Sequence, residues 1–101
     1  MISGYLVPDS DIVEIPFVYK CFHHEIGRLE ITLLIDNVNW PVIWHKYLRD
    51  EFILTDHNHK TILTDLFITG TYRSDLEVTF GKRIMSITDI NQYNNFISIN
   101  P

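Results

Sequence analysis

The chain has 101 residues, of which 46% are hydrophobic and 21% are charged, and its formal net charge at pH 7 is −5. This length suits one domain with a single core, and this composition argues against both a disordered chain and a membrane protein. The acidic balance, with eight scattered Lys and Arg residues, argues against a protein that coats nucleic acid. We therefore expect one compact domain over residues 1–101 without a nucleic-acid or membrane partner.

The cellular compartment is suggested by three features. No run approaches the roughly 18 apolar residues of a membrane span, and the first residues lack the basic and apolar regions of a secretory signal. Cys21 is the only cysteine, so no intrachain disulfide can form. We expect a cytoplasmic protein in which Cys21 is a small residue of a buried strand. The absence of alanine and the abundance of Ile and Asn suggest an A/T-rich gene, as phages and mobile elements carry.

The first part of the chain predicts a β-hairpin. After a turn-like lead over residues 1–11, residues 12–22 and 28–36 alternate in hydrophobicity with a period of two. The short connection between these strands contains Gly27, which suits a hairpin turn. Pro16 cannot donate to a ladder, which predicts an edge strand or a bulge at that residue. The predicted inward side chains are Val13, Ile15, Phe17, Tyr19, Cys21, Leu29, Ile31, Leu33 and Ile35.

The next segment predicts the principal helix, over about residues 40–51. Asn39 is a suitable N-cap and Pro41 is tolerated in the first turn. We expect this helix to cover one face of the sheet, with both tryptophans in the core rather than in a recognition patch. The apolar stripe at helical spacing comprises Trp40, Ile43, Trp44, Tyr47 and Leu48.

The remaining residues predict further strands and a short final element. Residues 52–55 and 61–72 are expected strands, separated by a polar turn over residues 56–60. A second hairpin is expected to turn at Gly81-Lys82, with Leu76, Val78 and Phe80 before the turn and Met85 and Ile87 after it. Thr88 or Asp89 is expected to cap a C-terminal helix through Ile90, Tyr93 and Phe96, while residues 97–99 also suit a strand.

These elements together predict an α+β domain. We expect a curled antiparallel β-sheet of about five strands, with the helix over residues 40–51 packed on one face and a short C-terminal helix.

Histidine is the candidate for chemistry, because four of the five histidines form two clusters at predicted turns. His57 and His59, with one of His23, His24 or Glu25, could ligate a zinc ion, which would make the protein a metal-binding domain or a metal-dependent hydrolase. The competing interpretation is that all four are solvated turn residues. We assign no catalytic residue, cofactor or resident metal, because no glycine-rich phosphate loop or nucleophile motif is present.

The outer face of the first hairpin is the better candidate for function. Apolar and charged side chains are mixed there, which calls for a covering element, most simply the C-terminal segment, or for a protein contact that includes a homodimer. The candidate partner-binding residues are Val18, Lys20, Phe22, Leu34 and Glu30.

We therefore expect a small protein-binding module that acts by occupancy, such as an inhibitor, an immunity protein, a chaperone or a phage-encoded or mobile-element accessory factor. The first alternative is the metal-dependent function of the histidine clusters. A third is a structural subunit of a phage or secretion assembly.

Overall fold

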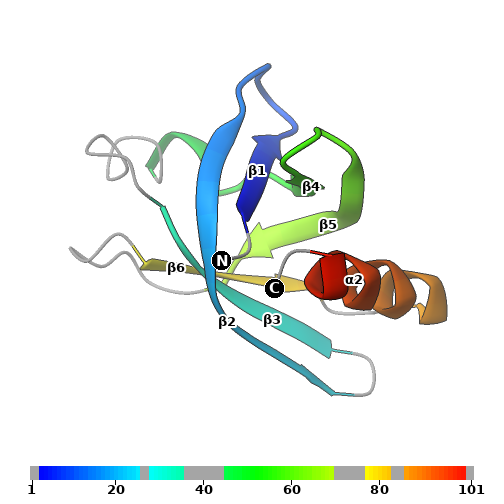
Figure 1. Ribbon diagram of the computed structural model, residues 1–101. Coiled ribbons are helices and arrows are strands. Elements are labelled where there is room, and N and C mark those ends of the chain that lie inside the picture. Colours follow the sequence, from blue (N-terminus) through cyan, green and yellow to red (C-terminus); the bar gives the residue numbers. More distant parts are fainter. Residues whose placement is uncertain (1–2, 26–27, 36–44, 70–76, 83–85, 100–101) are drawn as a thin grey trace.

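The computed structural model describes residues 3–25, 28–35, 45–69, 77–82 and 86–99 (Figure 1). Side chains are described at all of these positions except 19–25, 28, 77 and 99.

The described residues form six antiparallel strands that close into a barrel in the order β1-β2-β3-β6-β5-β4. The predicted α+β class and the antiparallel sheet are therefore confirmed. The prediction of about five strands in a curled sheet becomes six strands in a closed one. The elements are β1 Ser3–Pro8, β2 Ile15–Glu25, β3 Arg28–Leu34, β4 Phe52–Asp56, β5 Thr61–Ile68, β6 Glu77–Lys82 and α2 Ile87–Ile99 (Figure 1).

Strand β1 closes the barrel, although its residues read as a turn-like lead. It pairs with β2 on one side and with β4 on the other, so that Gly4 lies opposite both Phe17 and Asp56. Its buried positions alternate, but two of the three are Gly4 and Pro8, which leaves Leu6 as the one large apolar residue facing inward. A strand with so little apolar signal is hard to recognise from periodicity.

Closure also corrects the interpretation of Pro16. Strand β2 has neighbours on both sides, so it is not an edge strand. Pro16 is tolerated because it is the second residue of β2 and precedes the ladder to β3, which begins at Val18. The register irregularity of this strand lies between Tyr19 and Cys21 rather than at Pro16.

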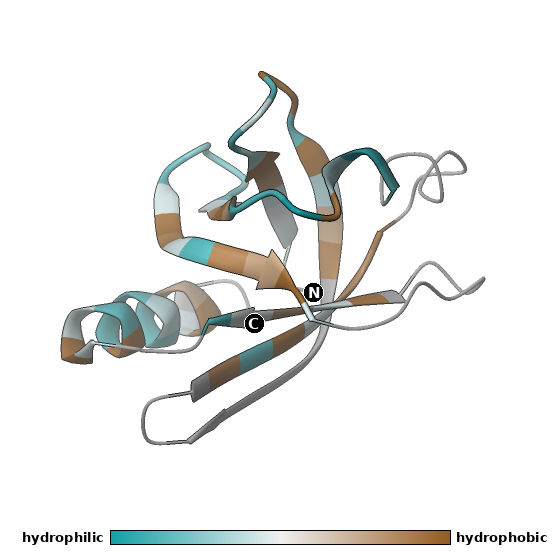
Figure 2. Cartoon of the chain, turned by 180° about the vertical axis from the view of Figure 1, so that it is seen from behind, coloured by the Kyte–Doolittle hydropathy of each residue, from teal (hydrophilic) through white to brown (hydrophobic). Residues whose placement is uncertain are grey.

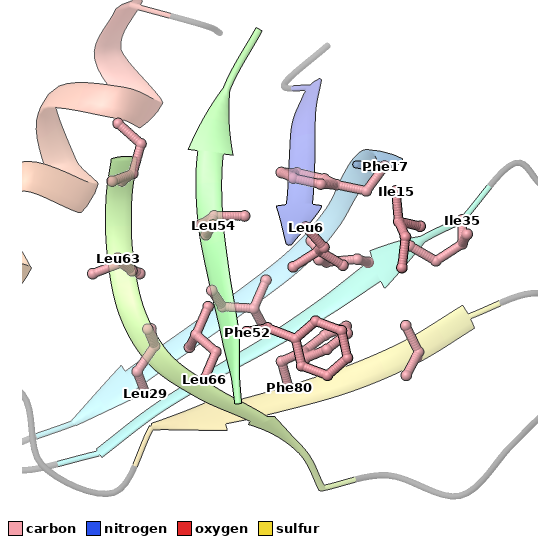
Figure 3. Close-up of a cluster of buried hydrophobic side chains, with 14 of the residues drawn as sticks. Leu6, Ile15, Phe17, Leu29, Ile35, Phe52, Leu54, Leu63, Leu66 and Phe80 are labelled. Carbon is pink, nitrogen blue, oxygen red and sulfur yellow. The ribbon is translucent and has the colours of Figure 1, made fainter. Parts of the chain in front are cut away.

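The barrel is filled by apolar side chains from every strand (Figure 3). Figure 2 shows brown and teal bands along β3, where buried and partly exposed positions alternate. The predicted inward positions Ile15, Phe17, Leu29, Ile31, Leu33 and Ile35 are all at most 3% exposed. Phe52 and Phe80 meet edge to face at the centre, with ring centroids 5.1 Å apart.

The second predicted hairpin is wrong. Strand β6 runs straight through Gly81 and Lys82, which pair with β3, and Gly81 also pairs with Phe67 of β5. The glycine serves a close approach instead of a turn, since a Cβ atom there would lie 2.6 Å from Thr69 Cγ2. Ile87, expected on the apolar face of a strand, begins α2 and is 79% exposed. Met85 lies outside the described residues.

Most of the predicted principal helix, including Trp40, Ile43 and Trp44, lies outside the described residues, so the core role of the tryptophans stays a prediction. Residues 45–47 are helical, and β4 begins at Phe52. The helix therefore ends earlier than residue 51. Of its expected apolar stripe, Tyr47 is buried, whereas Leu48 is 39% exposed.

Tyr47 connects this segment to the loop between β1 and β2. Its hydroxyl donates to Asp11 Oδ2 at 2.6 Å, and Lys46 Nζ lies 3.4 Å from the same oxygen. The Tyr47 hydrogen bond, together with one from the Ile12 amide, lowers the pKa of Asp11, and the Asp11 carboxylate raises the pKa of Tyr47. Next to this contact, Ser10 donates its amide and its hydroxyl to Asp50 Oδ2.

Helix α2 begins at a capping box. The Ser86 hydroxyl accepts a hydrogen bond from the Asp89 amide at 3.1 Å, and Asp89 Oδ2 accepts one from the Ser86 amide at 3.1 Å. The N-cap is thus Ser86 rather than Thr88 or Asp89, and Asp89 is its partner three positions later. The expected C-terminal helix is confirmed, and it continues to Ile99, which excludes the alternative strand over residues 97–99.

A buried lysine joins α2 to the barrel. Lys82 Nζ lies 3.1 Å from Asp89 Oδ2 and donates to the backbone oxygen of Thr64 at 3.2 Å. Burial, the largest single influence, raises the pKa of Asp89, but hydrogen bonds from Ser86 and Lys82 outweigh it and hold that pKa below its usual value. The Lys82 side chain is 8% exposed, so removing its carboxylate partner would leave a charge without compensation.

Two glycines should differ sharply in their tolerance of alanine. A Cβ atom at Gly4 would lie 2.0 Å from the backbone oxygen of Thr55, whereas the one at Gly81 would meet only the side chain of Thr69. We expect Gly4→Ala to lower the free energy of unfolding by about 2 kcal/mol or more. Gly81→Ala should cost less than Gly4→Ala, because only the Thr69 side chain must move, with the loss of its hydrogen bond to the Thr79 oxygen. Denaturant unfolding checks both, and equal costs would contradict the close approach at β1.

Asp89→Asn should lower the free energy of unfolding at pH 7 by roughly 1 to 3 kcal/mol. Since folding lowers the pKa of Asp89, the ionised carboxylate stabilises the fold above its unfolded pKa, and this contribution is lost as the pH falls through the folded pKa. The deficit of the variant should therefore shrink below about pH 4. Unfolding curves across pH test this, with the exposed Asp9→Asn as the control. A deficit independent of pH would refute the assignment.

Candidate functional site

The turn between β4 and β5 is built around the carboxylate of Asp56. Its Oδ1 accepts hydrogen bonds from the amides of Asn58 and Lys60 at 2.8 and 2.9 Å. The backbone adds bonds from the Asp56 amide to the Lys60 oxygen and from the His59 amide to the Asp56 oxygen, each of 3.0 Å. This arrangement is a self-satisfied Asx-type turn, which explains why a polar run of this composition folds here.

His59 is held by two neighbours in this turn. Its backbone φ of 65° lies in the left-handed region, which is unfavourable for a residue with a Cβ atom. The imidazole stacks on Tyr5 of β1, with ring centroids 4.6 Å apart and an interplanar angle of 10°. Its Nδ1 lies 2.9 Å from Glu14 Oε2. One face and one nitrogen of the ring are therefore occupied by protein groups.

His57 borders a cavity of about 300 Å³ at the surface of the β1–β2 pair. The walls come from the first residues of both strands, where Ser3 pairs with Val18 and Tyr5 pairs with Pro16. The cavity is mainly apolar, with polar groups at its border. The lining residues are Ser3, Gly4, Tyr5, Pro16, Phe17, Val18 and His57.

The cavity continues onto the predicted outer face of the first hairpin. Val18 pairs across the ladder with Leu34, and both side chains are partly exposed, as is Glu30. Helix α2, which was one candidate to cover this face, packs against β5 and contributes Tyr93 and Phe96 to the core. Three of the candidate partner-binding residues, Val18, Leu34 and Glu30, thus lie on the outer face of the β2–β3 pair.

The side chains of Lys20 and Phe22 lie outside the described part of the chain. The expectation that Phe22 faces outward and Cys21 inward assumed unbroken alternation along β2. The register shifts between Tyr19 and Cys21, and Phe22 then pairs with Ile31. That shift removes the basis of the original assignment for both residues.

The structure does not bring the two histidine clusters together. Asp56, which precedes His57, pairs with Gly4 of β1, and Gly4 also pairs with Phe17 of β2, so Asp56 and Phe17 lie at the same height in the barrel. His23 lies six positions beyond Phe17 on β2, which is about 20 Å along an extended strand. In Figure 1, the final residues of β2 lie on one side of α2, and the β4–β5 turn lies on the other side. Within the described residues, no three His, Cys, Asp or Glu side chains form a metal-binding group.

Sequence reasoning missed the contributions of Tyr5 and Pro16 to this site. Both depend on β1, whose weak apolar alternation over six residues was the only available signal. His57 and His59 were found by their clustering, but their separate surroundings required the tertiary structure.

The search for relatives returned nothing: no protein family model, curated protein or solved structure matches this chain. None of the helices within the described residues has the length and apolar character needed to cross a membrane.

The left-handed backbone of His59 yields a test of its role in the turn. His59→Gly should retain the turn, because glycine adopts this conformation without strain, although it loses the stacking on Tyr5 and the contact with Glu14. His59→Ala loses the same contacts and keeps the strain, so it should be about 1 to 2 kcal/mol less stable than His59→Gly. Denaturant unfolding measures the difference, and an alanine variant as stable as the glycine variant would be inconsistent with the observed backbone.

Proposed function

We propose that this protein is a small protein-binding module that acts by occupying a surface of its partner. The observation that carries the proposal is the apolar cavity beside Val18, which continues onto the partly exposed Val18–Leu34 pair. Inhibitors, immunity proteins, chaperones and accessory factors all act in this way.

The size and composition of the cavity support an anchoring role. Its volume of about 300 Å³ is at the lower end of the range for drug-sized ligands, which is roughly 300 to 1,000 Å³. A cavity of this size accepts one large apolar side chain. Interfaces concentrate binding energy where such a side chain enters a pocket. Tyr5 and Pro16 supply the rigid apolar walls here, and Ser3 and His57 supply polar groups.

The charge of the chain constrains the partner. The net charge of −5 favours a basic protein surface, because complementary potentials steer association. The same charge disfavours nucleic acid. We therefore propose a protein partner that presents an apolar residue within a basic surface.

Affinity capture with three matched variants tests this proposal. Immobilised protein should retain a stoichiometric partner from an extract of the native host, and Val18→Asp and Leu34→Asp should each reduce its recovery at least about tenfold. The control is Ile12→Asp, which introduces the same charge at a fully exposed position in the loop beyond the opposite end of β1. Thermal unfolding confirms that each variant is folded.

Two results would contradict the proposal. One is equal recovery of the partner by Val18→Asp, Leu34→Asp and the wild type. The other is the absence of any stoichiometric partner. Concentration-dependent self-association in sedimentation, abolished by Val18→Asp, would favour an assembly subunit instead.

A further inference from the structure

A second cavity, of about 250 Å³, lies between the β4–β5 turn and α2. The turn forms one wall and the helix forms the other, while the start of β5 lies between them (Figure 1). Of the described residues, His57 borders both this cavity and the apolar one beside Val18. The chemistry of the two cavities differs, so the second requires its own explanation.

The walls of this cavity are rich in neutral amides. Asn58 projects from the turn, and Gln92 and Asn95 lie three residues apart on α2, which places them on the same face of the helix. Each amide offers two N–H donors and one acceptor oxygen. Three such groups around one small volume can pair with neighbouring groups that both donate and accept, which is the property of adjacent hydroxyls.

The inner part of the cavity is apolar. Ile62 of β5 and Phe96 of α2 line it, and they are 8% and 3% exposed. Both belong to the hydrophobic core, so their positions are set by packing rather than by a ligand. A ligand that fits must therefore present an apolar face inward and polar groups along its edges.

The charges around the cavity favour a neutral ligand. Oδ1 of Asp56 accepts two backbone hydrogen bonds within the turn, and the positive charge of Lys60 offsets the negative charge of Asp56. Gln92 and Asn95 lie on either side of the midpoint of α2, away from the first and last turns where the partial charges of the helix act. An anion would be opposed by Asp56, and a cation would be opposed by Lys60.

We propose that this cavity binds one sugar ring, a neutral ligand with hydroxyls along its edge and an apolar C–H face. Asn58, Gln92 and Asn95 bind the hydroxyls, and Ile62 and Phe96 contact the apolar face. The volume is below the roughly 300 to 1,000 Å³ of sites for drug-sized ligands, which suits a single ring. This inference is independent of the proposed partner surface.

Titration with defined sugars tests the proposal. The probes are methyl β-glucopyranoside, methyl β-galactopyranoside, methyl α-mannopyranoside and N-acetylglucosamine, monitored by NMR of the 15N-labelled protein. At least one sugar should bind saturably with a Kd near about 1 mM or below. It should also shift the side-chain amide signals of Gln92 and Asn95.

Helix α2 provides matched controls. Gln92→Ala and Asn95→Ala should each weaken sugar binding at least about tenfold, because each removes hydrogen bonds to the ligand. Asn91 and Asn94 are exposed positions of the same helix that do not line the cavity. Asn91→Ala and Asn94→Ala should therefore leave the Kd unchanged. Alanine favours helix over both Asn and Gln, so none of the four changes should unfold α2.

The outcomes separate the alternatives. Failure of all four sugars to shift the Gln92 and Asn95 signals at about 50 mM, well above the expected Kd, would overturn the proposal. Equal losses in the Asn91 and Asn94 variants would also overturn it. Phosphate or acetate that binds more tightly than any sugar, with shifts centred on Lys60 and His57, would identify an anion site instead.

Discussion

The rest of this structure depends on the insertion of β1 between β2 and β4. The insertion requires a residue without a side chain at Gly4, because a Cβ atom there would lie 2.0 Å from the Thr55 oxygen. With β1 in place, the sheet has no free edge among the described strands, and Leu6 becomes part of the core. The same insertion places Tyr5 against His59 and forms the apolar cavity beside Val18. Fold and candidate site therefore share one structural cause.

On the opposite side of the barrel, α2 packs against β5 and a buried lysine links the helix to the sheet. Among the described residues, the ladder between β5 and β6 includes the pairs Phe67 with Gly81 and Ile68 with Phe80. Helix α2 packs beside the remainder of β5, and the buried Lys82 joins β6, β5 and α2 through Asp89 and the Thr64 oxygen. A groove lies between α2 and the β4–β5 turn. That groove carries the amide groups of the proposed sugar site.

Features that depend on residues close together in the sequence were predicted correctly, and features that depend on contacts between distant segments were not. Alternation identified Ile15 and Phe17 of β2 and the inward positions from Leu29 to Ile35, because burial on one face of a strand is a local pattern. It failed at Gly81, where the same pattern suited both a tight turn and a strand that another strand approaches closely. The candidate site was predicted in part. The histidines of the β4–β5 turn and Val18 were identified, whereas Tyr5, Pro16 and the groove beside α2 depend on contacts between distant segments.

The sequence by itself determined the antiparallel α+β class, most of the inward positions and the polar turn around His57, since each depends on neighbours a few residues away. Only the tertiary structure decided that the sheet closes, which strand closes it and that Lys82 is buried. It also decided that the β4–β5 turn with His57 and His59 lies near the start of β2, whereas His23 and His24 lie near its end. Closure is a property of the whole chain, because it depends on Gly4 meeting Thr55 about fifty residues later, and no local pattern encodes that approach.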